Sequence, residues 1–182
     1  FGHDESHPAF VAFRDRVLKQ YDVTRVEDLP VNFRGLSLRE DDENGYRIFD
    51  RHFGTLQEAY YRQDRWRAAP GFVFPLLAIQ PYSMGLAGSD TRGQYHFTRA
   101  AEQHRRAIQA MVSDDLIRNG RYGDSTYVAG PDLWARISAF SYRPPQAWWA
   151  LSAQAVNLLV LVAWWLAAGL LAVYAVRRLR PI

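Results

Sequence analysis

Histidines are the residues of this 182-residue chain whose spacing comes nearest to a metal site. His3 and His7 lie four residues apart, a separation that would bring two imidazoles to one ion if the segment were helical. They precede the first expected helix and have no third ligand beside them, so we expect a solvated chain end that binds no metal. His96 and His104 lie about 12 Å apart along a helix, which is too far to share an ion. We expect them to be surface or packing residues.

Acidic side chains occur as neighbouring pairs, Asp41 with Asp42 and Asp114 with Asp115. Neighbours on a helix diverge by about 100°, so such a pair cannot serve as acid and base on one substrate. The chain has no cysteine, and it contains no G-x-S-x-G, H-E-x-x-H or P-loop motif. We therefore predict a protein that is not an enzyme, uses no cofactor and cannot power transport by itself.

Charge is distributed unevenly along the chain. All 19 acidic residues and all but three of the 22 basic residues lie within residues 1–143, so this part has no net charge. Because its arginines are interleaved with acids, binding to nucleic acid is disfavoured. Residues 144–176 carry no charged side chain, and the remaining bases, Arg177, Arg178 and Arg180, close the chain.

The uncharged segment predicts a transmembrane helix. A hydrocarbon core of about 30 Å needs roughly 20 apolar residues, and residues 155–176 are nearly all Leu, Val, Ala and Trp. The alternative, a buried helix of a soluble protein, would need a polar face, whereas Asn157 is the one polar residue here. Aromatic and basic residues that favour the membrane interface flank the segment: Trp148, Trp149, Tyr174, Arg177 and Arg178.

The basic C-terminal flank also predicts the orientation. Short basic flanks stay in the cytoplasm, so residues 1–146 are expected on the opposite side of the membrane. The chain opens at Phe1 without a signal peptide, and we expect it to be a piece of a larger membrane protein. Small residues recur along the membrane helix and could admit a partner helix, although they are common in such helices: Ala163, Ala167, Ala168, Gly169, Ala172 and Ala175.

Periodicity predicts a mainly α fold, with a helical extracytoplasmic domain over residues 1–146, a transmembrane helix over 147–178 and a cytoplasmic tail over 179–182. Residues 22–35 are expected to be a connector without regular structure. Within the second helix, Gln57 is assigned to the solvated face, opposite an apolar face formed by Tyr46, Phe49, Phe53, Leu56 and Tyr60. The expected helices of the domain are residues 8–20, 42–68, about 91–119 and 131–137.

Residues 71–88 form a second uncharged segment, but its prolines and glycines argue against a second full span. Two interpretations remain open. The segment is either a buried centre of the domain or a broken amphipathic element at a membrane or partner surface. In the second case the contacting side chains are Phe72, Phe74, Leu76, Leu77 and Ile79.

Three stretches carry a family resemblance: HPAFVAFRDRVLKQYDV, VEDLPVNFRGL, and FPLLAIQPYSMGLAGSD followed by a helix rich in Ala, Glu and Arg. Together they resemble bacterial ABC-2 type transporter permeases that carry a large periplasmic domain of unknown function before their last transmembrane helix. The resemblance implies an inner-membrane protein with earlier membrane helices. It also implies a cytoplasmic ABC ATPase partner and a second permease subunit.

Two functions follow as hypotheses. The first is the C-terminal part of the permease subunit of an ABC-type exporter, in contact with the lipid bilayer and powered by a separate ATPase. The alternative is a membrane-anchored periplasmic binding, sensor or adaptor domain with no transport role. Topology comes from the residues themselves, whereas transport is implied by the resemblance alone.

Overall fold

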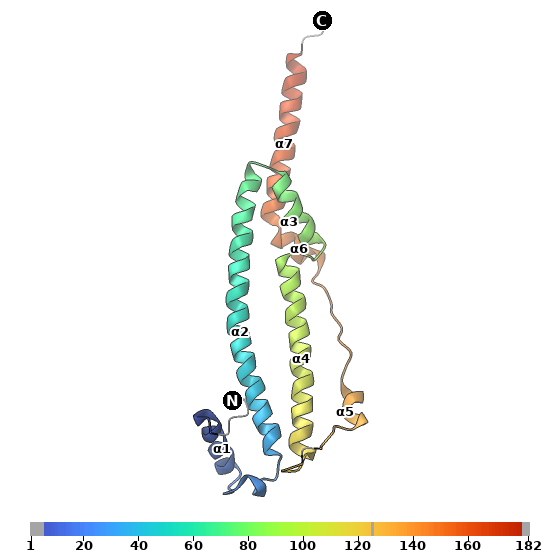
Figure 1. The fold of residues 1–182 in the computed structure, drawn as a ribbon. Helices are drawn as coiled ribbons and strands as arrows, with labels where there is room; N and C mark the ends of the chain where they lie inside the picture. Colours follow the sequence, from blue (N-terminus) through green and yellow to red (C-terminus); the bar gives the residue numbers. More distant parts are fainter. Residues whose placement is uncertain (1–5, 125, 180–182) are drawn as a thin grey trace. The chain divides into compact units, whose positions relative to one another are not determined.

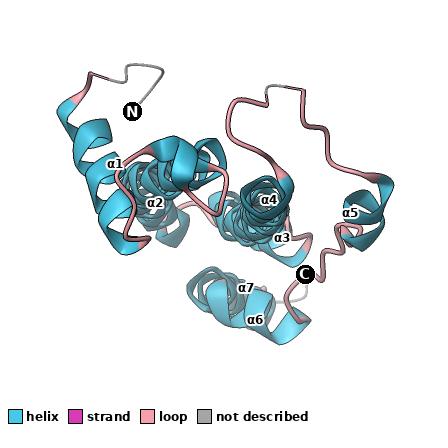
Figure 2. Ribbon diagram, turned by 90° about the horizontal axis from the view of Figure 1, so that it is seen from below, coloured by secondary structure: helices cyan, strands magenta, loops and turns pink. Residues whose placement is uncertain are grey.

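The structure is a computed structural model that describes residues 6–124 and 126–179, and these residues form helices and loops with no strand (Figure 2). The mainly α fold class is therefore confirmed. The chain divides into two compact units, residues 1–53 with 101–141 and residues 54–100 with 142–182. Two long helices, α2 (Phe33–Ala68) and α4 (Thr91–Asn119), contribute to both units (Figure 1).

The first unit has its core at the N-terminal end of α2. Helix α1 (Pro8–Gln20) buries Phe13 and Val17 against Phe33. The rings of Phe13 and Phe33 have their centroids 5.7 Å apart. The predicted bounds of this helix are confirmed, and His7 caps it, because its Nδ1 accepts a hydrogen bond from the N–H of Ala9 at 3.2 Å.

Helix α2 begins at Phe33, although residues 22–35 were expected to lack regular structure. The connector holds only the short 3₁₀ helix η1 (Val26–Asp28). Asn32 explains the earlier start, because its side chain accepts a hydrogen bond from the N–H of Gly35 at 3.0 Å and so caps the first turn. Its backbone N–H donates to the carbonyl of Ile117 at 2.9 Å, which ties the start of α2 to α4.

The predicted faces of α2 need correction. Gln57, assigned to the solvated face, is buried, whereas Phe49, Leu56 and Tyr60 of the expected apolar face are exposed. The apolar stripe therefore does not mark the packed side of α2. In agreement with the prediction, α4 runs from Thr91 to Asn119.

The second unit is organised around the C-terminal helices. The structure has two helices over residues 147–178, α6 (Ala147–Ala153) and α7 (Ala155–Arg178), with a break at Gln154. A 3₁₀ turn, η2 (Ala69–Phe72), leads into α3 (Leu76–Leu86), which packs against α6 and α7. Helix α3 is about 16 Å long, too short to cross a bilayer.

Helix α7 contains the predicted membrane segment. It has 24 residues and is the one helix of the described chain that is long and apolar enough to cross a membrane. Only 6% of its most apolar stretch is buried, which is unlike the core helix of a soluble protein. In the first unit, α5 (Pro131–Arg136) matches the predicted brief helix, and residues 138–146 are without regular structure.

Candidate functional site

The apolar segment 71–88 lies along the first half of α7. At one end, the indole Nε1 of Trp164 donates a hydrogen bond to the carbonyl oxygen of Phe72 at 3.0 Å. At the other end, Gly85 lies directly against the side chain of Gln154 and leaves no room for a Cβ atom. The segment therefore runs antiparallel to residues 154–164, as the positions of α3 and α7 in Figure 1 also show.

Small residues make this close approach possible. Ala78 and Gly85 form the buried side of α3. Gly71, in η2, is also buried, and a Cβ at this position would lie 3.4 Å from the Cβ of Ala78. Because these positions carry little or no side chain, the backbones of α3 and its neighbours can pack closely.

The other side of the segment is exposed and apolar. The five residues predicted to contact a membrane or partner are between 46% and 77% exposed: Phe72, Phe74, Leu76, Leu77 and Ile79. They therefore do not form the buried centre of the described chain. Several exposed apolar side chains within one short segment are typical of a contact with lipid or with another protein.

The predicted interface anchors lie on α6 and in the C-terminal part of α7. Trp148 is exposed on α6, and Trp149 of the same helix has its ring centroid 6.1 Å from that of His96. At the C-terminal end, the guanidinium of Arg178 lies over the ring of Tyr174, 4.7 Å from its centroid. Arg177 and Arg178 form the last turn of α7, where positive charge also complements the helix dipole.

A polar joint, formed by Asp90, Gln154 and Asn157, connects α4 with α7. One carboxylate oxygen of Asp90 accepts from the N–H of Gly93 at 2.8 Å and so caps α4. Its other oxygen accepts from the amide of Gln154 at 2.9 Å, and Gln154 in turn accepts from Asn157 at 2.7 Å. The joint satisfies the buried amides of Gln154 and Asn157, and only the unusual polarity of Asn157 hinted at it in the sequence.

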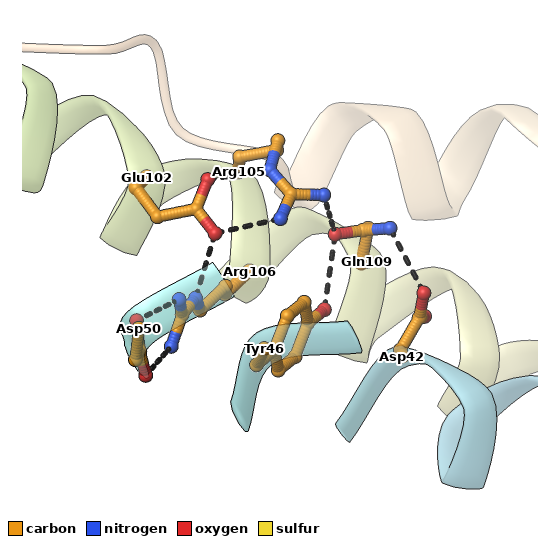
Figure 3. Close-up of polar contacts among 7 residues, drawn as sticks. All are labelled: Asp42, Tyr46, Asp50, Glu102, Arg105, Arg106 and Gln109. Carbon is orange, nitrogen blue, oxygen red and sulfur yellow. Dashed lines mark hydrogen bonds and ion pairs between the residues drawn. The ribbon is translucent and has the colours of Figure 1, made fainter. Parts of the chain in front are cut away.

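A second polar cluster joins α2 to α4 in the first unit (Figure 3). Arg106 forms a two-point ion pair with Asp50, at 2.5 and 2.9 Å, and also donates to Glu102 at 2.8 Å. Arg105 donates to both oxygens of Glu102 at 2.6 and 2.7 Å. We call the whole cluster the α2–α4 network; its members are Asp42, Tyr46, Asp50, Glu102, Arg105, Arg106 and Gln109.

The two uncharged members of the network, Tyr46 and Gln109, are hydrogen-bonded to each other. Tyr46 donates its hydroxyl proton to Gln109 at 3.0 Å, and Gln109 donates to Asp42 at 3.1 Å. The guanidinium of Arg106 lies 4.5 Å from the centroid of the Tyr46 ring. Each polar side chain of this cluster thus has a partner on the facing helix or on its own.

The hydrogen bonds, charges and burial within the network shift the pKa values of several of its members. Hydrogen bonds from Arg105 and Arg106 hold the pKa of Glu102 below its usual value. The pKa of Arg106 is raised, chiefly by its hydrogen bonds to Asp50. Burial, together with the charge of Asp42, raises the pKa of Tyr46. Because its pKa is lowered, the Glu102 carboxylate is a poor proton donor or acceptor near neutral pH. It forms ion pairs with Arg105 and Arg106 of the same helix.

His7, His96 and His104 take capping or packing positions. His96 Nδ1 lies 3.1 Å from the hydroxyl oxygen of Tyr142, and the ring of His104 packs against Phe140. His3 lies outside the described residues, while His7 caps α1. Over residues 6–124 and 126–179, no three His, Asp or Glu side chains come close enough to hold a metal ion.

These features define a mainly α protein with one candidate membrane-spanning helix at its C-terminal end. The chain belongs to the DUF3526 family, because the model of that family, described as a domain of unknown function, matches residues 2–143. No curated protein matches the chain. No solved structure matches it either.

Proposed function

We propose that the chain is the C-terminal part of the permease subunit of an ABC-type exporter. In this proposal α7 is the last membrane helix, and the preceding helical domain projects from the bilayer. The observation that carries the membrane role is the exposure of α7, whose apolar surface needs lipid or other helices around it. The permease role is supported by the resemblance of residues 7–23, 26–36 and 74–90 to such transporters.

The proposal includes an orientation. Arg177 and Arg178 end α7, and basic flanks of this kind are retained in the cytoplasm. The helical domain then lies on the periplasmic side of a bacterial inner membrane, which leaves the energy-supplying subunit on the opposite side. The chain itself has no P-loop motif, so the proposal assigns ATP hydrolysis to a separate subunit. A second permease subunit would cover part of α7, whose Gly169 has open space around it.

The direct test is purification of the native gene product from its own bacterial membranes after mild cross-linking, followed by identification of what is attached to it. We expect a protein with a P-loop, together with ATP hydrolysis in the purified complex. A purified protein that carries a single membrane helix and no ATPase would contradict the transporter role. The matched control is the same purification of a Gly169→Leu variant, whose bulkier side chain should weaken pairing of α7 with another membrane helix.

One observation favours the second function, a membrane-anchored binding or adaptor domain. Apolar side chains of η2 and α3 are exposed, and exposed apolar side chains of this kind are typical of a contact with another protein. If the purification above recovers a soluble periplasmic protein in place of an ATPase, the adaptor function replaces the permease function.

A further inference from the structure

We propose that the turn between α2 and α3 inserts into the bilayer beside α7, in the same leaflet as the first half of that helix. We call residues 69–77 the hairpin tip, since α2 leads into it and α3 leads back (Figure 1). Its partner is the hydrocarbon of the lipid leaflet. This inference rests on the proposed membrane span of α7 and adds to it a second, shorter membrane-embedded element.

The depth of the tip follows from its register with α7. The apolar run of α7 begins at Ala155, and Trp164 lies about 14 Å further along the helix axis. Since Trp164 donates a hydrogen bond to the carbonyl of Phe72, the hairpin tip lies at the same depth as Trp164. The contact of Gly85 with Gln154 places the far end of α3 at the membrane edge.

Moving α7 outward cannot keep the tip in water. If Trp164 lay at the membrane edge, the remaining apolar run, residues 165–176, would be about 18 Å long. That length falls well short of a hydrocarbon core of about 30 Å. A spanning α7 therefore brings the tip below the headgroup layer.

The chemistry of the tip suits this position. Residues 69–89 contain no charged side chain, and Phe72, Phe74 and Leu76 are exposed around the turn. Phe72 and Phe74 are bulky apolar residues whose transfer from water into hydrocarbon is favourable.

Several backbone N–H and C=O groups of the tip have hydrogen-bond partners within the protein. The N–H groups of Val73 and Phe74 both donate to the carbonyl of Pro70, at 3.0 and 2.9 Å. The N–H of Leu77 donates to Phe74 at 3.0 Å, and the carbonyl of Phe72 is satisfied by Trp164. Pro70 and Pro75 have no N–H to satisfy. Backbone polar groups in hydrocarbon need such internal partners.

Two of the four charged residues over 62–67, Arg62 and Arg65, lie within about 6 Å of Tyr61 along the axis of α2. Tyr61 is held at the start of α4, with its ring centroid 6.4 Å from that of Tyr95 and 5.7 Å from the guanidinium carbon of Arg92. Arg62 and Arg65 follow within one turn and are exposed. Their long side chains can reach back to the lipid headgroups while the turn beyond them is immersed.

Spin labelling tests the depth, and the absence of cysteine makes single-site labels simple to introduce. The 182-residue chain is reconstituted in vesicles of phosphatidylethanolamine and phosphatidylglycerol. A nitroxide is attached at Phe74→Cys, at Leu77→Cys or at Met84→Cys. Relaxation by oxygen, which concentrates in hydrocarbon, is compared with relaxation by a neutral water-soluble nickel complex. Leu170→Cys in the middle of α7 and Val128→Cys, an exposed position of the first unit, are the references.

We expect an oxygen-to-nickel ratio several-fold higher at Phe74 than at Val128, falling from Phe74 through Leu77 to Met84. A Phe74 label as open to nickel as Val128, with Leu170 shielded, overturns the hairpin while leaving the span intact. Exposure of both Phe74 and Leu170 to nickel means that α7 does not span, and the proposed function fails with it. Shielding of Phe74 from both reagents overturns the lipid partner, because a protein then covers the tip.

Discussion

Arg106 contributes to the packing of α2 on α4 through three different contacts. It pairs with Asp50 on α2, donates to Glu102 on its own helix and covers the ring of Tyr46. Isolated surface ion pairs contribute little to stability, but here the charges share partners and are partly shielded from water. The α2–α4 network thus joins the turn of α2 that carries Tyr46 and Asp50 to the turn of α4 that carries Arg106.

Glu102→Gln should lower the free energy of unfolding by about 1 to 2 kcal/mol at pH 7, because it removes the carboxylate that two arginines share. The folded-state pKa of Glu102 lies below its unfolded value, so this stabilisation is present above about pH 4.5 and is lost as the pH falls through the lowered pKa. The measurement is thermal unfolding by circular dichroism in detergent micelles across this pH range. Glu58→Gln, an exposed position on α2, is the matched control. A Glu102→Gln effect that is equal to the control, or that persists unchanged at pH 3, would contradict the network's role.

Polar contacts between residues close in sequence can be predicted from this chain, whereas those between distant residues cannot. Asp90 could be predicted as a cap because its partner, the N–H of Gly93, is three residues away. The pairing of Asp50 with Arg106 could not, since it depends on how two helices far apart in sequence align. Gln57 was misplaced for the same reason, because its burial depends on packing that helical periodicity does not report.

At the scale of the elements, α2 is longer than its apolar pattern indicated. Its first turn lies close to the end of α4, and Gly35 is the residue that permits this approach. A Cβ atom at Gly35 would lie 2.7 Å from the Cγ1 of Ile117 and 2.9 Å from its backbone nitrogen. The sequence suggested that Gly35 ends a loop, whereas it is a helical residue selected by packing.

Two glycines of α2 give opposite predictions. Gly35→Ala should destabilise the fold by about 1 to 3 kcal/mol, since the methyl group has to displace the backbone of α4. Gly45→Ala should stabilise it by about 0.5 to 1 kcal/mol, because nothing lies within 4 Å of the new methyl group and alanine favours the helix. Thermal or denaturant unfolding of the two variants in parallel measures both. Equal effects at the two positions would contradict the close approach of α2 to α4.

How well each helix could be predicted depends on whether periodicity, composition or packing specifies it. Helices α1 and α4 have strong periodicity and local caps, and their bounds were predicted to within a residue or two. Helix α7 could be predicted from its apolar composition alone. Helix α3 was not predicted as a helix, because Pro81 within it and the flanking glycines indicate turns. Its packing against α7 supplies the order that local preference lacks.

At the scale of the whole molecule, the uneven charge pattern is the most informative feature of the chain. A domain without net charge is followed by an uncharged helix that is almost entirely exposed and by a basic end. Membership of DUF3526 covers the helical domain and assigns it no activity. The proposed function therefore requires that α7 crosses a membrane with the helical domain on one side.

The most direct test places one cysteine on each side of that membrane. Val128→Cys and Leu179→Cys are made separately, and intact spheroplasts that contain each variant are treated with a maleimide that cannot cross the bilayer. We expect labelling at residue 128 without further treatment, and at residue 179 only after the membrane is permeabilised. Labelling of both positions in intact spheroplasts, or of both only after permeabilisation, would contradict a membrane-spanning α7.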